Sequence, residues 1–252
     1  MLRRLTSLAR GLAHREREPE WMDEEDVDEH QLRRSLAFIR RVNGLFGYTR
    51  ATLSHLDRFS KGWTRGERIT IIDLATGSAD VPRAIVQWGR RRGFELRVVA
   101  VDLHEKTIRA AQQATAGESR IHVVQCDALH LPFRAGSFDY AVCSMFLHHL
   151  SDDDAAAVLR EMSRVARRGV LAADLLRHRR AYAWISLFTL WANPIVRHDA
   201  RVSVLQAFSR AEVLALRERT GIRFLDYFKH FGHRFVLAGE KPKTNPEGHG
   251  TS

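Results

Sequence analysis

The stretch from Ile69 to Ile85 constrains the fold of this chain more than any other part of its sequence. It opens with an apolar run, Ile69–Leu74, whose length and β-branched residues predict a buried strand. Five small residues follow at 75–79, and Asp80 as an N-cap with Pro82 in the first turn predicts the start of a helix. A strand, a small-residue turn and a helix start are typical of a nucleotide-binding α/β unit.

Downstream, short apolar runs alternate with amphipathic segments. Further strands are predicted at Leu96–Leu103, Ile121–Gln125, Phe138–Ser144 and Val170–Asp174, and helices at Val81–Arg92, Glu105–Thr115, Asp152–Ala166 and Ser209–Thr220. Repeated strand–helix units imply a parallel sheet covered on both faces. Two final strands, Ile222–Phe228 and Arg234–Glu240, are so close in sequence that at least one must run antiparallel. We therefore expect a Rossmann-like, doubly wound α/β fold.

The flanking segments suggest the following organisation. Helical spacing runs through Gln31–Phe59 and is interrupted near Gly44–Gly47, which predicts two helices. The expected divisions are a disordered basic tail at 1–20, an N-terminal helical lid at 21–62, the α/β domain at 63–241 with an aromatic insertion at 178–208, and a flexible tail at 242–252.

The net charge indicates which kinds of partner the chain can attract. The chain has 40 Lys and Arg against 30 Asp and Glu, a net charge of +10. This excess favours anionic partners, but it is spread over several helices, so a solvated surface is preferred over specific nucleic-acid binding. The basic segment 1–17 leaves peripheral contact with an acidic membrane as an alternative to disorder.

Cys126 and Cys143, the only cysteines, offer neither a disulfide framework nor a CxxC metal motif. Residues 1–20 lack the apolar core of a signal peptide, and the longest apolar run, Ala181–Val196, is too short to span a bilayer comfortably. We expect a soluble cytoplasmic protein without a resident metal, either a monomer or a homodimer.

Acidic residues end three of the predicted strands: Asp73, Asp102 and Asp127. Ligands of open parallel sheets bind at the carboxyl ends of the strands. There Asp102 suits the two hydroxyls of a ribose, and Asp127 with the Ala128 N–H suits an adenine ring. The turn has one glycine, Gly77, rather than Gly-x-Gly-x-x-Gly, and its carboxylates repel a pyrophosphate. A ligand with cationic sulfonium and ammonium groups fits better.

These motifs carry a resemblance to a known family. The sequences DLATGSA (73–79), VDL (101–103), CDALHLPF (126–133) and FDYAVCSMFLHHL (138–150) resemble class I S-adenosylmethionine-dependent methyltransferases, in particular small-molecule enzymes such as the ubiquinone/menaquinone-biosynthesis group. The resemblance implies a seven-stranded sheet, mostly parallel with an antiparallel last strand, and S-adenosyl-L-methionine as cofactor. Ala75 and Ala79 depart from it, because the family usually has glycine there.

The resemblance also implies the placement of the cofactor. The methionine part would be held by Asp73, Ala75, Thr76, Gly77 and Asp80, and the ribose by Asp102 and Leu103. The adenine would be held by Asp127 and Ala128, and the methyl group would lie beside Ser144 and Met145.

Chemistry on the acceptor is assigned to His148. It lies in a segment similar to the Leu-His-Asp-Trp-Ser-Asp segment of plant small-molecule O-methyltransferases, where the histidine is the base, and its pKa range suits deprotonation of a phenol. The alternative is a packing or helix-start role, which is favoured for His149. The acceptor-binding candidates are His149, Trp184, Phe188, Trp191, Arg197 and His198.

The predicted reaction is O-methylation of a small hydrophobic acceptor, such as a phenolic or polyketide-like hydroxyl. Three alternatives stay open: C-methylation of a quinone-type ring, RNA methylation, and cofactor binding without turnover. Exocyclic-amine methyltransferases resemble one another in an Asn/Asp-Pro-Pro-aromatic motif after the fourth strand, whereas this chain has Cys-Ser-Met-Phe at 143–146. The sequence therefore favours a small-molecule acceptor over nucleic acid.

Overall fold

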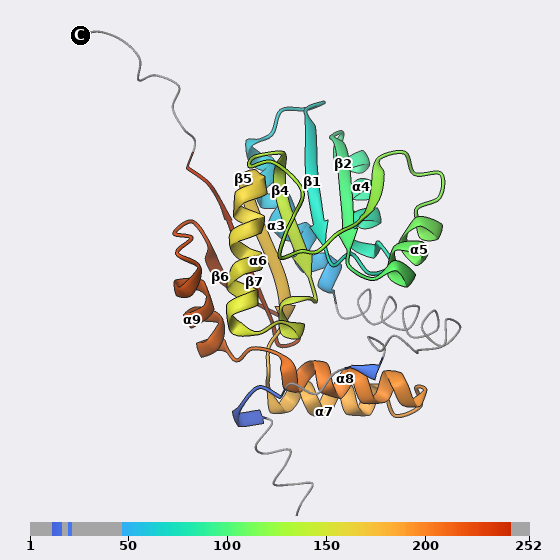
Figure 1. Cartoon of the computed structure of the whole chain (residues 1–252), viewed down its shortest axis with the longest axis vertical. Coiled ribbons are helices and arrows are strands. Elements are labelled where there is room, and N and C mark those ends of the chain that lie inside the picture. The colour runs from blue at the N-terminus through green and yellow to red at the C-terminus, as the bar shows by residue number, and fades with distance from the viewer. Residues whose placement is uncertain (1–11, 17–19, 22–46, 243–252) are drawn as a thin grey trace, which may run out of the picture.

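The computed structural model describes residues 12–16, 20–21 and 47–242. Its centre is a seven-stranded sheet with the order β3-β2-β1-β4-β5-β7-β6 (Figure 1). The strands are β1 Arg68–Leu74, β2 Glu95–Asp102, β3 Ile121–Gln125, β4 Phe138–Ser144, β5 Ala166–Leu175, β6 Asp226–His230 and β7 Arg234–Glu240. The first five pair in parallel, and β7 runs antiparallel to both β5 and β6. The predicted fold class is confirmed.

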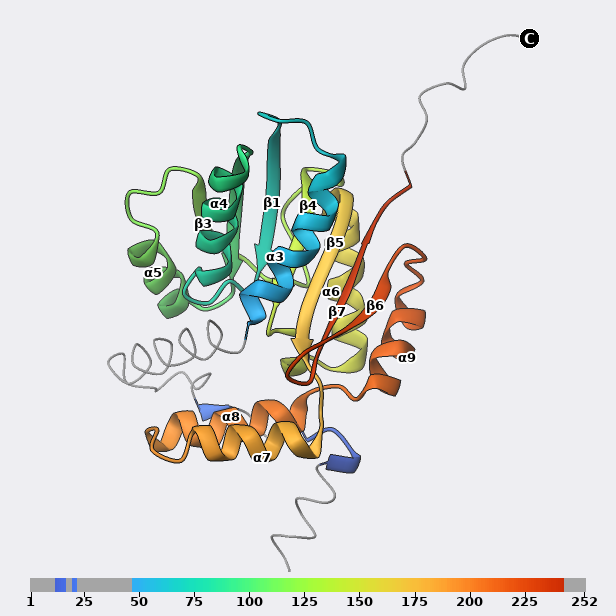
Figure 2. The same ribbon diagram turned by 180° about the vertical axis from the view of Figure 1, so that it is seen from behind.

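Helices cover both faces of the sheet. One face packs against α3 (Tyr48–Phe59) and α4 (Asp80–Arg92), which lie in front of the strands in Figure 2. The other packs against α6 (Asp152–Val165) and α9 (Arg210–Thr220), while α5 (Glu105–Ala114) packs at the β2–β3 edge. Successive side chains of a strand point to opposite faces of the sheet, so one strand contributes to the apolar clusters on both faces. In β1, Ile69 and Ile71 join the first cluster, whereas Ile72 and Leu74 join the second.

The N-terminal segment differs from its prediction. Gly47, in a left-handed conformation, begins α3, which confirms an interruption there. Leu56 and Phe59 are buried against the sheet, and Phe59 stacks on Tyr140 with ring centroids 5.3 Å apart. The helix α3 therefore belongs to the core layer and is not a lid. The other predicted helix, within 22–46, lies outside the described residues, as does the flexible tail from 243 onwards.

Some element ends also differ. The strand β5 begins at Ala166, directly after α6, because its early residues are already in the ladder with β4. The strand β6 is Asp226–His230 rather than Ile222–Phe228, and Leu225 is buried in the preceding turn. The N-cap of α4 is Ala79, with no side-chain cap, so the prediction of Asp80 as the N-cap is wrong.

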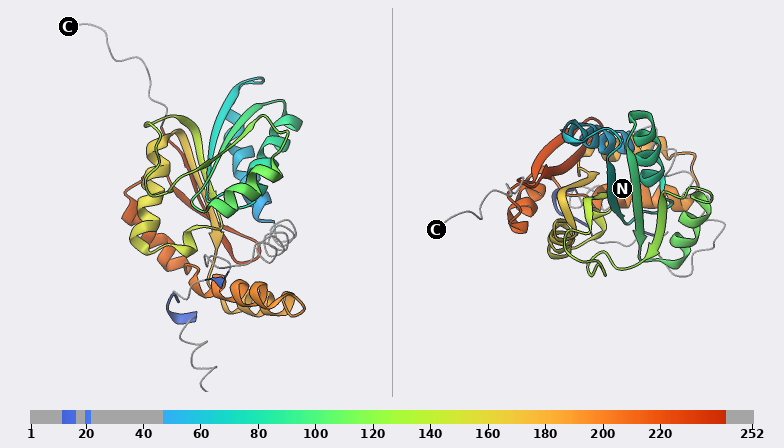
Figure 3. Two further views of the ribbon diagram at one scale, coloured as in Figure 1. Left: turned by 45° about the vertical axis from the view of Figure 1, so that its right-hand side comes forward. Right: turned by 90° about the horizontal axis from the view of Figure 1, so that it is seen from above.

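A separate helical layer lies beyond the carboxyl ends of the parallel strands. It consists of α7 (Arg179–Phe188) and α8 (Pro194–Gln206), which pack side by side and lie across one end of the molecule, below the strand ends (Figures 1 and 3). The predicted insertion at 178–208 coincides with this layer. Among the described helices, none is both long enough and apolar enough to cross a bilayer.

Candidate active site

A cavity of about 870 Å³ lies between the strand ends and the α7–α8 layer. Two groups of residues line it. At the strand ends these include Ala75, Gly77, Asp102, Leu103, Asp127, Ala128 and Met145. On the other side they include Glu20, His148, His149, Trp184, Ile185, Phe188 and Phe231. We refer to these two parts as the cofactor end and the acceptor end.

The turn after β1 has three residues in the left-handed region. Their φ angles are 52° at Ala75, 56° at Gly77 and 57° at Ala79. An alanine in this conformation costs about 1–2 kcal/mol. The turn is held by main-chain hydrogen bonds, from the Thr76 N–H to the Val101 carbonyl at 2.9 Å and from the Ala79 N–H to the Thr76 carbonyl at 3.0 Å. The two alanines therefore adopt the backbone that glycine would favour, at an energetic cost.

Asp73 lies buried beneath this turn and accepts a hydrogen bond from Thr76 Oγ1 at 2.7 Å. Burial raises the pKa of its carboxyl group to about 7, and the charges of Asp102 and Asp80 act in the same direction. Its Oδ1 has no partner among the described residues. An added cation would satisfy this oxygen and favour the charged carboxylate, so the position suits a ligand with an ammonium group.

Asp102 is fixed by main-chain donors. Its Oδ2 accepts from the Gly77 N–H at 3.0 Å and its Oδ1 from the His104 N–H at 3.2 Å. Burial raises its pKa, although these N–H groups oppose the change. Asp127, at the end of the neighbouring strand, accepts from the Leu129 N–H at 2.8 Å. The two carboxyl groups are thus placed at adjacent strand ends, as the sequence predicts.

The structure separates the predicted cofactor residues into two sets. Seven line the cavity: Ala75, Gly77, Asp102, Leu103, Asp127, Ala128 and Met145. Four are outside its lining: Asp73, Thr76, Asp80 and Ser144. Ser144 instead shares a 3.1 Å hydrogen bond with Thr52 of α3, so its expected place beside the methyl group stays a prediction.

His148 forms a buried pair with Asp174, at the end of β5. Its Nδ1–H donates to Asp174 Oδ1 at 2.7 Å, and its main-chain N–H donates to Oδ2 at 3.0 Å. Burial alone lowers the pKa of His148, but the charge and hydrogen bond of Asp174 outweigh it, so the pKa is raised. Burial alone raises the pKa of Asp174, but His148 holds it below its usual range. The pair fixes the ring and leaves Nε2 for the cavity.

Glu20 faces the same ring. Its Oε1 lies 3.8 Å from His148 Nε2, and it accepts a hydrogen bond from Ser203 Oγ of α8. Sequence reasoning missed this residue, because it placed residues 1–20 in a disordered tail. Asp174 was also missed as a site residue, although its position at a strand end, like that of Asp73 and Asp102, was a usable signal.

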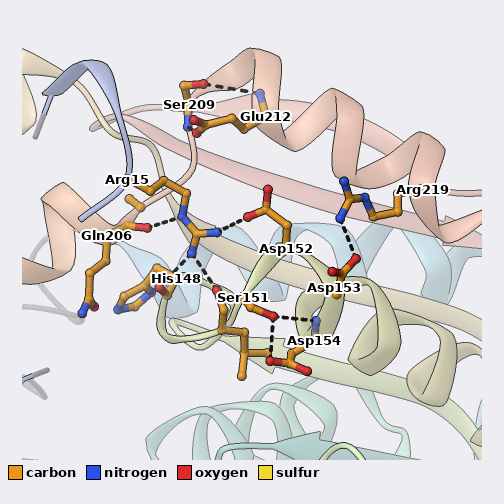
Figure 4. Close-up of polar contacts among 12 residues, drawn as sticks. Arg15, His148, Ser151, Asp152, Asp153, Asp154, Gln206, Ser209, Glu212 and Arg219 are labelled. Atoms are coloured by element: carbon orange, nitrogen blue, oxygen red, sulfur yellow. Dashed lines mark hydrogen bonds and ion pairs between the residues drawn. The ribbon is translucent and has the colours of Figure 1, made fainter. Parts of the chain in front are cut away.

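Arg15 holds the segment before Glu20 against the core. Its guanidinium lies 3.6 Å from the centroid of the Phe208 ring. It also donates to Asp152 Oδ1 at 2.6 Å and to the carbonyl oxygens of Leu150 at 2.8 Å, Gln206 at 2.8 Å and His148 at 3.1 Å (Figure 4). We call residues 12–16 and 20–21 the strap. These contacts differ from the disordered tail that the sequence predicts.

Three side chains at the acceptor end have the donor types of a metal site. Ligand atoms of Glu20, His148 and His149 all lie within 4.8 Å of one another, and this is the one such group within the described ranges. His149 lines the cavity. Desolvation of its ring, and then the charge of His148, lower its pKa. The sequence expectation of no resident metal stays a prediction, tested below.

The acceptor candidates are only partly brought together. Trp184, Phe188 and His149 line the cavity, whereas Trp191, Arg197 and His198 do not. The side chain of Trp191 is 87% exposed. His198 instead stacks on Trp21 of the strap, with ring centroids 3.9 Å apart. The lining residue Phe231, in the turn between β6 and β7, was missed because its position follows only from the sheet order.

Residues 71–169 match the family model described as "Methyltransferase domain". These residues form a class I methyltransferase domain. S-adenosylmethionine is the cofactor of this class, and the buried Asp73 oxygen, the turn at Gly77 and Asp102 fit it. A Cβ atom added at Gly77 would meet no atom within 4 Å, so the turn is open on that side.

Individual relatives agree with this assignment. Demethylmenaquinone methyltransferase of Staphylococcus carnosus (strain TM300) is 32% identical over 104 residues, which cover 41% of this chain and 41% of that protein. The ubiquinone/menaquinone biosynthesis C-methyltransferase UbiE of Xylella fastidiosa (strain M23) is 28% identical over 163 residues, 64% of this chain and 57% of that protein. The chain therefore spans only about half the length of these curated relatives.

A solved structure extends the likeness at the level of the fold. A SAM-dependent methyltransferase from Aquifex aeolicus has a TM-score of 0.57 and 17% identity, and the match covers 85% of this chain and 99% of that one. At this identity the likeness concerns the fold alone. It covers more of the chain than the family model does, and so includes elements on both sides of the methyltransferase domain segment.

Proposed function

We propose that this protein methylates a hydrophobic hydroxyaromatic acceptor at a hydroxyl oxygen, with His148 as the general base. The observation that carries the proposal is the His148–Asp174 pair, which presents one ring nitrogen to a cavity between the cofactor turn and an aromatic wall. S-adenosylmethionine supplies a methyl group already activated on a sulfonium, so the protein must chiefly position the acceptor and remove its proton.

The proton transfer follows from the contacts of the ring. Asp174 holds the proton on Nδ1, so Nε2 accepts the proton of the acceptor hydroxyl. The hydroxyl oxygen gains the electron pair with which it bonds to the methyl carbon. The resulting imidazolium lies between the carboxylates of Asp174 and Glu20, which favour its charge. The same carboxylates raise the pKa of His148, so its base form increases as pH rises through that raised value.

The acceptor end supports an apolar ring. Trp184, Ile185 and Phe188 of α7 line this side of the cavity, with Leu175 and Leu176 at the end of β5. Such a wall excludes water from the base and favours an aromatic or aliphatic acceptor over a sugar.

Carbon methylation is the second candidate, because the curated relatives are named demethylmenaquinone methyltransferase and C-methyltransferase. The same base serves both reactions, since deprotonating a ring hydroxyl also raises the electron density at the adjacent ring carbon. In that case the new bond forms to carbon, and a ring proton is lost afterwards.

The deciding experiment incubates the protein with S-adenosylmethionine and a panel of phenols, hydroquinones and polyketide-like phenols. A mass gain of one methylene identifies a product, and NMR of the new methyl group distinguishes oxygen from carbon. Cofactor binding in calorimetry without any product would instead support a binding protein. Salt-dependent retention of RNA with methylation of that RNA would support the nucleic-acid alternative and overturn the proposal.

A further inference from the structure

Large apolar side chains are exposed on α7, in the turn after it and in the turn between β6 and β7. They are Trp184 at 58%, Leu187 at 55%, Leu190 at 47%, Trp191 at 87% and Phe231 at 96% exposed. We call these five residues the α7 face. Four come from α7 and the turn after it, and Phe231 comes from the turn between β6 and β7. Exposed apolar residues are ordinary when scattered, but clusters mark interaction sites.

The helix α7 itself is unusual in its burial. Seven of its ten residues, in the sequence RRAYAWISLF, are apolar or aromatic, yet none is fully buried. Its inner side, with Ala181 and Ile185, packs against a small cluster of Leu175, Val204 and Ala207. A surface helix normally turns polar residues outward. Here Trp184 and Leu187 of the helix, and Trp191 in the turn after it, are exposed and apolar as well.

The α7 face adjoins the cavity. Trp184 and Phe231 both line the cavity and are both exposed on the surface. The start of α7 contacts the turn between β6 and β7, where His178, the N-cap of α7, stacks on His233 with ring centroids 4.1 Å apart. The face therefore borders the opening through which the cavity reaches solvent.

We propose that the α7 face docks on a lipid bilayer containing acidic headgroups. Exposed cations lie beside it: Arg179 and Arg180 at the start of α7, and Lys229 two residues before Phe231. The whole chain carries a net charge of +10, which adds long-range attraction to an anionic surface. Tryptophan, phenylalanine and leucine beside arginine are the side chains of interfacial helices. This charge and composition favour lipid over a second basic copy of the chain.

Docking in this orientation would place the cavity opening at the membrane surface. A hydrophobic acceptor dissolved in the bilayer could then enter without crossing water. This last consequence rests on the proposed function, whereas the docking itself does not, so each can fail without the other.

Vesicle flotation tests the docking with the full-length protein. The probes are vesicles of phosphatidylcholine with phosphatidylglycerol in equal parts, and vesicles of phosphatidylcholine alone. We expect binding to the anionic vesicles, weakened by salt. The double variant Leu187→Asp with Leu190→Asp should bind them at least about tenfold less well, because both apolar side chains lose their burial in lipid. Neither leucine lines the cavity, so turnover of a water-soluble acceptor should not change.

The matched control is Val124→Asp, which replaces an exposed apolar residue on β3, 36% exposed and outside the α7 face. It should bind vesicles like the original protein. Three results would overturn the proposal. One is no vesicle binding, and another is equal binding by the double variant. The third is a dimer in light scattering that the double variant abolishes, which would assign the face to a second copy. Circular dichroism confirms that each variant is folded.

Discussion

The cofactor end and the acceptor end of the cavity are built in different ways. The cofactor end comes from consecutive strand ends and the turn at 75–79, and its key contacts are main-chain hydrogen bonds such as that from the Gly77 N–H to Asp102. The acceptor end combines Glu20 of the strap, His148, Trp184 of α7 and Phe231 near the C-terminus. The cofactor end is held by main-chain contacts at consecutive strand ends. The acceptor end is assembled from side chains that are far apart in the sequence.

This difference separates two tasks of a methyltransferase. A common cofactor is recognised by a backbone pattern that any chain with the same sheet can supply. The acceptor is recognised by side chains on segments attached to that sheet, which are free to vary. Variants at the two ends should therefore affect different measurements.

The largest expected effect is at His148. Replacing it in His148→Ala should lower turnover by about 10²–10⁴-fold, because a general base contributes a factor of that size. Binding of S-adenosylmethionine in calorimetry should not change. The neighbouring variant His149→Ala is the control and should lose less than about tenfold, since the proposed proton transfer uses His148 Nε2 and not His149. Undiminished methylation by His148→Ala would remove the assignment of the base.

The next effect is on cofactor affinity. Asp102→Ala should weaken S-adenosylmethionine binding by about 100-fold, the equivalent of losing charge-assisted hydrogen bonds worth about 2–3 kcal/mol. Glu20→Gln, at the acceptor end, should bind the cofactor normally. Calorimetry on both variants measures this contrast. If both lose affinity equally, the two ends are not separable and the comparison is wrong.

The pH dependence of turnover tests the buried pair. Because Asp174 raises the pKa of His148, the base form exists above that raised value and activity should increase with pH through it. Asp174→Asn removes the charge, so the His148 pKa falls and the rising limb of the pH–rate profile should move to lower pH. A limb that stays in place would show that another group limits the rate.

Metal removal makes a further distinction within the acceptor end. The proposed mechanism uses His148 as a proton acceptor, so dialysis against a chelator should leave turnover unchanged. Activity that is lost on chelation and restored by a divalent ion would show instead that Glu20, His148 and His149 hold a metal.

The smallest effect is on the turn of the cofactor end. Ala79→Gly should increase the free energy of unfolding by about 1 kcal/mol, because alanine is strained at a φ of 57° and glycine is not. The same substitution inside α4, Ala84→Gly, should cost about 1 kcal/mol instead. Thermal denaturation measures both. Destabilisation by both variants would show that Ala79 is not strained.

Most of the fold and the cofactor end could be predicted from the sequence. Apolar periodicity located the strands, and Asp73, Asp102 and Asp127 marked their ends because parallel strands share one carboxyl edge. The start of β6 was wrong because Ile222, Phe224 and Leu225 are apolar for another reason, packing against the core from a turn. Apolar pattern reports burial, and it does not distinguish a strand from a packed turn.

Much less of the acceptor end could be predicted, for the same physical reason. Glu20 and Phe231 have no local pattern that marks them, and they reach the cavity only because Arg15 holds the strap and β7 inserts between β5 and β6. His148 was predicted from its motif as the base, which stays a prediction, whereas its contact with Asp174 follows from tertiary structure. Side chains brought together by tertiary structure leave little trace in a single sequence.

The contacts of Arg15 have a consequence for how such a chain can evolve. Its guanidinium donates to the carbonyl oxygens of His148, Leu150 and Gln206 and to the side-chain carboxylate of Asp152. Every amino acid supplies a carbonyl oxygen, so most of this anchorage is indifferent to which side chains mutation places at those positions. The side chains from His148 to Leu150 can therefore change while the strap stays attached, and binding of new methyl acceptors can evolve without first rebuilding the fold.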